Sequence, residues 1–265
     1  PTLGLVVERF RQNLNFTPKA FYTLALDHLI RDRQNLTFHW NRTRVETRRE
    51  LEGALERIRG ERGARVKTVS EKDVRKGAPL PLSTIEFEKR AARWLRIGAK
   101  EAMGVAERLY QRGLISYPRT ETNRFPDEFD HDSILAVQAQ SPVWGEYAKN
   151  LLSSKRSVNH SLLNVTNTDH LTRSSRPRFR VPAKGPDDDK AHPPLHPVNF
   201  TTALTPEDAK VYQLICRHYL ASCSADAQGI SRTVELKKGG ETFKLSITSV
   251  SDPGYLAVYP YEKWG

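Results

Sequence analysis

Tyr117 is the residue whose type and setting point most directly to covalent chemistry. It lies in the stretch G-L-I-S-Y-P-R-T-E-T-N, residues 113–123. Because Pro118 disfavours a helical conformation at the residue before it, we expect an extended loop in which Arg119 points to the same side as Tyr117. A phenolic oxygen there can attack a phosphodiester and form a phosphotyrosine ester, while the guanidinium clamps the phosphate. Neutral donors suited to phosphate oxygens follow at Thr120, Thr122 and Asn123.

A second motif, D-D-D-K-A-H-P-P-L-H-P at residues 187–197, contains two histidines. His192 and His196 are four residues apart, but the prolines exclude the helix that a zinc-binding pair of this spacing requires. The prolines instead predict a stiff, extended segment in which an imidazole can hydrogen-bond a phosphate or move a proton. The three aspartates that open the motif could bind a divalent ion or simply be solvated.

Each motif also has a structural interpretation that the residues alone leave open. Tyr117 could pack its ring on neighbouring helices without reacting, since a tyrosine near an arginine is common. The His-Pro segment could be a rigid connector with incidental histidines. A tyrosine recombinase is a further alternative, but it needs several Arg and His residues over a longer span, and we cannot place them in this sequence.

The charge balance favours a polyanionic partner. The 265 residues carry 42 Lys and Arg against 31 Asp and Glu, a formal net charge of +11. Nucleic acid is favoured over an anionic membrane, because the cations do not follow one long amphipathic helix. A basic surface that only keeps the protein in solution is the alternative.

No apolar run approaches the ~18 residues that a membrane span needs. Cys216 and Cys223 indicate buried thiols in a reducing compartment.

Hydrophobic periodicity predicts a helical middle between strand-rich ends. Helices are expected at 1–14, 46–59, 83–95, 99–112 and 205–222. Strands are expected at 21–24, 36–40, 64–74 and within 230–260, with a hairpin turn at 238–241. A capping box should join Ser83 and Glu86, and residues 153–185 should form a long loop. This order indicates an α+β chain in which a helical domain is inserted into a β-rich one, as part of a larger protein.

Taken together, four segments resemble the type IA DNA topoisomerases, in particular the topoisomerase III group of the eukaryotic alpha type. The tyrosine motif together with the His-Pro motif is highly specific for this family. The resemblance covers most of the chain and displaces the interpretation of Tyr117 as a packing residue. The segments occur in the family's order and are residues 1–9 (P-T-L-G-L-V-V-E-R), 115–123, 189–197 and 225–229 (A-D-A-Q-G).

The resemblance implies roles for particular residues. Tyr117 looks like the nucleophile that cuts one DNA strand and keeps its 5′ phosphate. Arg119 looks like the residue that positions this phosphate, and His192 like an imidazole that contacts it. No metal ligand is implied in this chain. DNA-binding residues are implied at Arg9, Lys190, Thr120, Thr122, Asn123 and His196.

The resemblance also implies a multidomain arrangement. Residues 78–225 look like the movable active-site domain, with a winged-helix-like helical core, and the Pro-rich joint at 78–82 is a plausible pivot. Residues 19–77 and 226–265 look like the two halves of an arched, β-rich gate domain. Residues 1–18 look like the end of the single-strand-binding domain.

The activity implied is cleavage of one DNA strand, passage of another strand and religation without ATP, which relaxes or decatenates DNA. Mg²⁺ is expected from a TOPRIM domain that this chain does not contain, so we expect the isolated chain to be inactive. The implied partners are single-stranded DNA, a RecQ-type helicase and an OB-fold scaffold protein, with no membrane. The nucleus is the expected compartment, with the mitochondrion as a second one. The alternative function is a non-catalytic gate module that binds DNA and partner proteins.

Overall fold

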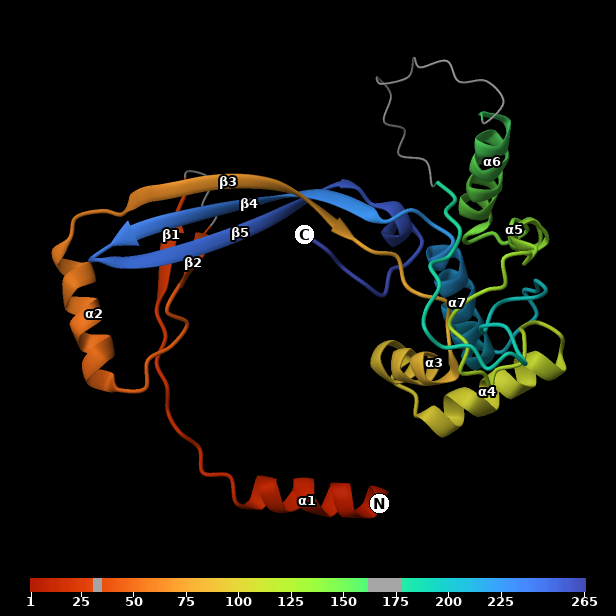
Figure 1. The fold of residues 1–265 in the computed structure, drawn as a ribbon, viewed down its shortest axis with the longest axis horizontal. Helices are drawn as coiled ribbons and strands as arrows, with labels where there is room; N and C mark the ends of the chain where they lie inside the picture. Colours follow the sequence, from red (N-terminus) through yellow and green to blue (C-terminus); the bar gives the residue numbers. More distant parts are fainter. Residues whose placement is uncertain (31–34, 162–177) are drawn as a thin grey trace. The chain divides into compact units, whose positions relative to one another are not determined.

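The computed structural model describes residues 1–30, 35–161 and 178–265, and it combines helices with one five-stranded sheet (Figure 1). The strands are β1 (Ala25–Leu29), β2 (Asn35–Trp40), β3 (Arg65–Lys76), β4 (Ala227–Lys238) and β5 (Glu241–Asp252). Neighbouring strands follow the order β1-β2-β5-β4-β3, and β2 is antiparallel to both β1 and β5. The mixture of helices and antiparallel strands that the sequence predicts is confirmed.

Most helices lie in the middle of the chain. No helix in the described residues is long and apolar enough to cross a membrane. The α-helices are α1 (Thr2–Leu14), α2 (Arg48–Gly60), α3 (Thr84–Arg90), α4 (Ala99–Gln111), α5 (His131–Gln138), α6 (Gly145–Ser161) and α7 (Pro206–Ser222). Two further turns are the π-helical η1 (Ala91–Leu95), which continues α3, and the 3₁₀ turn η2 (Gly254–Ala257).

The residues cluster into two compact units. Unit 1 contains residues 1–72 and 231–247, and unit 2 contains residues 73–230 and 248–265. The tyrosine motif and the His-Pro motif both lie in unit 2. Residues 248–265, which the resemblance assigns to the second half of a gate domain, cluster with unit 2.

Unit 1 has a small core to which β2, α2, β4 and β5 all contribute buried side chains. Phe38 and Trp40 alternate along β2 and are both buried, as a strand with one covered face requires. Trp40 donates its indole N–H to the buried carboxylate of Glu241 at 2.9 Å. The side chain of Thr47 caps α2 by accepting a hydrogen bond from the backbone N–H of Glu50.

The hairpin between β4 and β5 turns at two glycines, as the sequence predicts. Gly239 and Gly240 have φ values of 58° and 78°, which lie in the left-handed region that a two-residue hairpin turn requires. Strands β3, β4 and β5 each have residues in both units, so the chain passes between the units along them.

The core of unit 2 forms where α4 packs against α7. One face of α4 is fully buried, with Ala102, Val105, Ala106 and Leu109 at helical spacing. Beyond α4, the backbone N–H of Leu114 donates to the carbonyl of Leu109 at 3.0 Å, and Gly113 adopts a φ of 68°. This left-handed ending redirects the chain into the loop that carries Tyr117.

The expected helix start at residue 83 is confirmed, but its capping box is wrong. Ser83 occupies the N-cap position without a side-chain hydrogen bond to the helix. The Glu86 carboxylate pairs instead with Lys89 and Arg90, three and four residues further along the same face. Two cations at this spacing attract the carboxylate more strongly than one neutral N–H does.

Two further local predictions were wrong. The first strand begins at Ala25 rather than at residue 21, and the earlier stretch contributes only a bridge between Tyr22 and Val45. Residues 153–161 continue α6 instead of belonging to a loop. The buried Ala148 and Leu151 anchor this helix, although its polar composition favours a loop. Residues 162–177 of the expected loop lie outside the described residues.

His218 is a buried, neutral member of the unit 2 core. Its side chain lies on α7 and is 1% exposed. Its Nε2 is 2.8 Å from the carbonyl oxygen of Leu80, so this nitrogen carries the proton and Nδ1 accepts from the Tyr259 hydroxyl at 2.9 Å. Burial lowers the pKa of His218 to about 3.

This burial predicts a loss of stability on acidification. The unfolded chain binds a proton at His218 below pH ~6.5 whereas the folded chain stays neutral, so stability falls between pH 7 and pH 5. We expect His218 alone to lower the free energy of unfolding by roughly 2 kcal/mol over this interval. Urea unfolding at several pH values measures the slope, which should be shallower in His218→Gln. Equal slopes in the two proteins would contradict the assignment.

Candidate active site

The tyrosine motif and the His-Pro motif form two loops that run side by side in opposite directions. Near one end, the backbone N–H of Val198 donates to the carbonyl of Leu114 at 2.8 Å. Near the other end, the N–H of Asn123 donates to the carbonyl of Asp187 at 3.1 Å. Gly185 lies so close to Asn123 that a Cβ atom would come within 2.0 Å of its side chain. We call residues 113–124 and 185–198 the paired loops.

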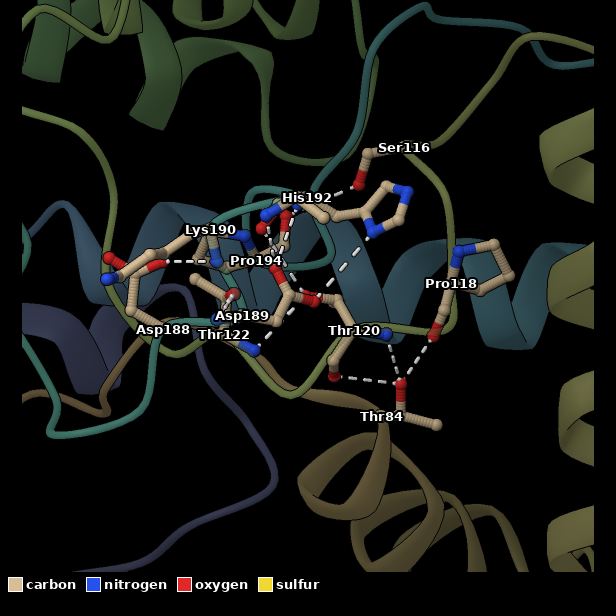
Figure 2. Close-up of polar contacts among 11 residues, drawn as sticks. Thr84, Ser116, Pro118, Thr120, Thr122, Asp188, Asp189, Lys190, His192 and Pro194 are labelled. Carbon is tan, nitrogen blue, oxygen red and sulfur yellow. Dashed lines mark hydrogen bonds and ion pairs between the residues drawn. The ribbon is translucent and has the colours of Figure 1, made fainter.

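This pairing brings Tyr117 and His192 together. The Tyr117 ring is half-buried and lies with its centroid 4.7 Å from that of the His192 ring, tilted by 42°. The His192 ring points toward the part of the loop between Ser116 and Pro118 (Figure 2). Tyr110 of α4 packs its ring edge-on against Tyr117 at 5.4 Å. The phenol is thus held between an imidazole and a second tyrosine, at the surface of unit 2.

Arg119 lies close by in the sequence but is occupied by another partner. Its guanidinium pairs with the Glu107 carboxylate of α4, with Nε donating to Oε1 at 2.9 Å. The hydrogen bond and charge of Glu107 raise the pKa of Arg119 above its ordinary value. Because both side chains are exposed, the pair is open to competition from other anions. Sequence reasoning did not identify Glu107, since nothing in the motif marks it.

Asp189 holds the turn that presents His192. Its Oδ1 accepts the backbone N–H groups of His192 at 2.8 Å and of Ala191 at 2.9 Å (Figure 2). These two hydrogen bonds hold the pKa of Asp189 well below its ordinary value. The other oxygen, Oδ2, accepts from the Thr120 hydroxyl at 3.2 Å and lies 3.8 Å from His192 Nδ1. Asp189 therefore fixes the turn that carries the imidazole and remains ionised.

Thr84, at the start of α3, fastens the tyrosine loop just beyond Tyr117. Its hydroxyl oxygen lies 2.7 Å from the carbonyl of Pro118, 2.9 Å from the carbonyl of Thr120 and 2.7 Å from the N–H of Thr120 (Figure 2). The hydroxyl accepts from that N–H and shares its proton between the two carbonyls. Sequence reasoning missed Thr84 because its distance along the chain gives no signal of this contact.

Three of the implied DNA-binding side chains are buried in this structure. Thr120 and Thr122 are 3% and 2% exposed, and Thr122 Oγ1 accepts the backbone N–H of Asp189 at 3.0 Å. His196 packs between aromatic rings, and burial lowers its pKa, so the imidazole is neutral. Its Nδ1 lies 2.6 Å from the carbonyl of Pro194 and must donate to it. These side chains support the loops from inside.

The remaining implied DNA-binding residues lie at the surface or in the other unit. Lys190 is exposed and has a φ of 56°, in a turn that Asp188 closes by accepting the Lys190 backbone N–H at 2.9 Å. The Asn123 side chain exchanges hydrogen bonds with Asp187, at 2.6 Å and 3.0 Å. Arg9 is exposed on α1 in unit 1.

The profile of the DNA topoisomerase family matches residues 1–265, the whole chain. The chain belongs to this family. It is 38% identical to DNA topoisomerase 3 of Caenorhabditis elegans, and that alignment covers all of this chain and 32% of the relative. It is 36% identical to DNA topoisomerase 3-alpha of Homo sapiens, covering all of this chain and 24% of the relative. The resemblance to the topoisomerase III group is confirmed.

A solved structure agrees with this assignment at the level of the fold. The chain superimposes on full-length topoisomerase I from Thermotoga maritima with a TM-score of 0.68 at 20% identity, covering 99% of this chain and 39% of that one. DNA topoisomerase 3 of Saccharomyces cerevisiae is 36% identical, and the match covers 40% of its length. The chain therefore spans between about a quarter and two-fifths of these curated relatives.

Two cavities border the paired loops of this topoisomerase chain. One has a volume of about 930 Å³ and the other about 460 Å³. Over residues 121–124 and 187–190, successive side chains line first one cavity and then the other, as expected where successive side chains of an extended backbone point to opposite faces. The cavities therefore lie on opposite faces of the paired loops. The larger is lined by Arg119, Thr120, Glu121, Asn123, Asp187 and Asp189, and the smaller by Thr122, Arg124, Asp188, Lys190 and His192, each with further residues.

The aspartates of the His-Pro motif do not fit a metal site. Among residues 1–30, 35–161 and 178–265, no group of three or more His, Cys, Asp or Glu side chains is placed to hold a metal ion. Asp187, Asp188 and Asp189 each accept hydrogen bonds from the paired loops instead. Mg²⁺ thus remains an expectation for a region outside this topoisomerase chain.

The contacts of Thr84 predict that its hydroxyl sets the position of the tyrosine loop. Thr84→Val keeps the shape of the side chain but leaves the Thr120 N–H and one carbonyl without their partner. We expect a loss of about 1–3 kcal/mol in the free energy of unfolding and faster amide exchange at Thr120. Urea unfolding and hydrogen exchange measure both effects. Thr202→Val, at an exposed threonine, is the matched control; the prediction fails if the two variants behave alike.

Proposed function

We propose that this chain is the central part of a type IA DNA topoisomerase, similar to topoisomerase III, in which Tyr117 cleaves one DNA strand. The observation that carries the proposal is the contact between the Tyr117 ring and the His192 imidazole, 4.7 Å apart between centroids. Two motifs 75 residues apart in the sequence, as 192 − 117 gives, meet there at the surface of one unit. The family membership of the whole chain supports the same function.

The reaction exchanges one ester for another. The Tyr117 oxygen forms a bond to the phosphorus of the backbone, and the bond from phosphorus to the 3′ oxygen breaks. The phenol loses its proton and the departing 3′ oxygen gains one, so the new phosphotyrosine ester keeps the free energy of the original link. Reversal by the free 3′ hydroxyl reseals the strand, and no ATP is needed.

This chain supplies groups that bind and orient the phosphate. His192, held by Asp189, donates a hydrogen bond to a phosphate oxygen, and Arg119 exchanges the Glu107 carboxylate for the phosphate. A phenol has a pKa of about 10 and is mostly neutral at pH 7, so its ionisation needs further electrostatic help. We propose that this help comes from an acidic, Mg²⁺-binding region outside this chain.

The proposal includes the domain arrangement and partners that the resemblance implies. Residues 78–225 act as an active-site domain inserted between gate segments 19–77 and 226–265, and residues 1–18 belong to a single-strand-binding domain. Passage of a strand through the break requires motion between such domains. Single-stranded DNA is the substrate, a RecQ-type helicase and an OB-fold scaffold are partners, and the nucleus, with the mitochondrion second, is the compartment. The net charge of +11 and the eukaryotic relatives support this set.

The test asks whether a covalent adduct forms between the protein and DNA, and whether it requires the Tyr117 hydroxyl. The 265-residue chain is assayed with labelled single-stranded DNA, alone and together with the N-terminal region of a topoisomerase 3 relative. We expect no adduct from the chain alone and an adduct on complementation, because the acidic, Mg²⁺-binding region that we propose assists the reaction lies outside this chain. Tyr117→Phe should abolish the adduct while leaving DNA binding intact.

Tyr110→Phe is the matched control, because it removes a hydroxyl from the ring that packs against Tyr117. It should retain the adduct. If DNA binding is sensitive to salt but neither the chain alone nor the complemented chain forms an adduct, the non-catalytic gate module is supported instead. Robust DNA relaxation by the chain alone would overturn the proposal that cleavage needs groups outside this chain.

The Arg119–Glu107 pair generates a separate prediction about DNA binding. Since a phosphate must displace Glu107, Glu107→Gln should free the guanidinium and tighten binding of single-stranded DNA roughly two- to fivefold. Fluorescence anisotropy of a labelled oligonucleotide at low salt measures this change. Glu101→Gln, on the same helix, is the control for the loss of one negative charge. The same increase in both variants would show a general charge effect and no exchange at Arg119.

A further inference from the structure

The smaller cavity, of about 460 Å³, has the chemistry of a site for a nucleobase. Its volume is within the range of small-molecule sites. It lies wholly within unit 2, on the face of the paired loops that carries His192. Its wall is apolar and aromatic and its rim is charged. The apolar residues are Phe125, Pro126, Phe129, Ala191 and Pro193, and the charged ones are Arg124, Lys184, Lys190, Asp127 and Asp188.

The aromatic wall is fixed before any ligand arrives. Phe129 is half-buried and packs its ring 4.5 Å from that of Phe125, which is 6% exposed. Behind it, the His131 ring lies at 4.8 Å and the His196 ring stands perpendicular at 5.0 Å. Phe129 is therefore backed on several sides and keeps part of its ring accessible. Single-stranded nucleic acid is commonly held on such aromatic surfaces, where any base can stack.

The rim leaves positive charge available. Lys184 is paired with Asp127, and Asp188 accepts the backbone N–H of Lys190. Within the residues that the structure describes, neither the Lys190 ammonium nor the Arg124 guanidinium has an ion-pair partner. With three cations against two carboxylates at its mouth, this apolar pocket suits a ligand with a flat apolar part and an adjoining anion. A nucleotide has both.

The position of His192 connects this cavity to the cleavage chemistry. The imidazole touches the Tyr117 ring on one side and lines the cavity on the other. A phosphate that is bonded to Tyr117 and contacted by His192 would therefore place the attached nucleotide beside the cavity. We propose that the cavity binds the base of the nucleotide whose 5′ phosphate becomes bonded to Tyr117, by stacking on Phe129 with Lys190 and Arg124 on its backbone. This proposal rests on the proposed function, because that function defines which nucleotide Tyr117 holds.

The site would hold the cut strand while the break is open. The ester alone allows the strand to rotate about its bonds, whereas a stacked base restricts its direction. Recognition by stacking is tolerant of sequence, so the site should accept all four bases and favour none by hydrogen bonding. Binding the strand without sequence-specific contacts suits an enzyme that must act at many positions.

The test removes one base at a time. Single-stranded DNA with one mapped cleavage position is synthesised with an abasic residue at each position in turn. Its affinity is measured with the complemented chain carrying Tyr117→Phe, so that no cleavage interferes. We expect loss of the base immediately 3′ of the cleaved bond to weaken binding about tenfold, and loss of more distant bases to matter less.

Two variants identify the cavity as the cause. Phe129→Leu keeps an apolar side chain but removes the flat ring, and in it the abasic substitution should cost less than about twofold. Lys190→Gln, on the exposed rim, should lower the salt dependence of binding by about one phosphate contact without affecting folding. Lys149→Gln, an exposed lysine of α6 outside the cavity, is the matched control and should leave the salt dependence unchanged.

The outcomes separate the two proposals. A normal Tyr117-dependent adduct with equal abasic penalties in the parent and Phe129→Leu proteins overturns the base site and leaves the proposed function standing. Absence of any adduct with Tyr117 intact overturns the proposed function and the base site with it. A salt dependence that is the same in Lys190→Gln and the parent protein removes Lys190 from the site.

Discussion

Residues 113–124 and 185–198 pair along their backbones although both segments contain prolines, which have no N–H to donate. Hydroxyl groups fill the positions where the ladder would otherwise be incomplete. The Ser116 hydroxyl accepts the N–H of His196 at 3.0 Å and lies 3.3 Å from the carbonyl of Pro194, and Thr84 acts similarly on the other side of the tyrosine loop. A hydroxyl can donate and accept at once, so a few of them complete an irregular pairing. The contact of Tyr117 with His192 depends on this pairing and on the side-chain links that accompany it, such as those from Thr120 and Thr122 to Asp189.

The charged side chains near Tyr117 are also held by contacts within the protein. Two acidic side chains near Tyr117 are occupied by the protein: Glu107 by Arg119, and Asp189 by the backbone N–H groups of Ala191 and His192. The two acids differ in the hydrogen bonds that they accept and therefore in how permanent their contacts are. The carboxylate of Asp189 accepts hydrogen bonds that form the loop itself, whereas Glu107 and Arg119 meet at an exposed surface where a phosphate can compete. A DNA strand that approaches Tyr117 therefore meets the Arg119 guanidinium, which can exchange partners, and the His192 imidazole, which the loop holds in place. The Asp189 carboxylate keeps its hydrogen bonds throughout.

The helices α4 and α7 and the β4–β5 hairpin could be predicted from sequence, because each has a strong local signal: a left-handed glycine at Gly113, a helix start at Thr205–Pro206 and two glycines in the hairpin. The link between the tyrosine and His-Pro motifs came from family resemblance, since local patterns do not encode contacts between distant loops. The burial of His196 and the pairing of Arg119 could not be predicted, because both depend on which helix lies behind each loop. α6 was missed for a related reason: its polar residues favour a loop, and its few buried side chains stabilise the helix only through tertiary packing.

The alternation of the paired loops explains why several residues of one motif serve different purposes. In extended backbone, neighbours such as Asp188 and Asp189 face opposite sides, so one lines the smaller cavity and the other the larger. The motif residues that line the larger cavity include Arg119, whereas those that line the smaller one include His192 and Lys190. A strand whose phosphate lies at Tyr117 would therefore meet the guanidinium on one face and the imidazole on the other, at the edge where the two faces join. The division also follows stretches of chain, because residues 119–121 all line the larger cavity and residues 190–193 all line the smaller one.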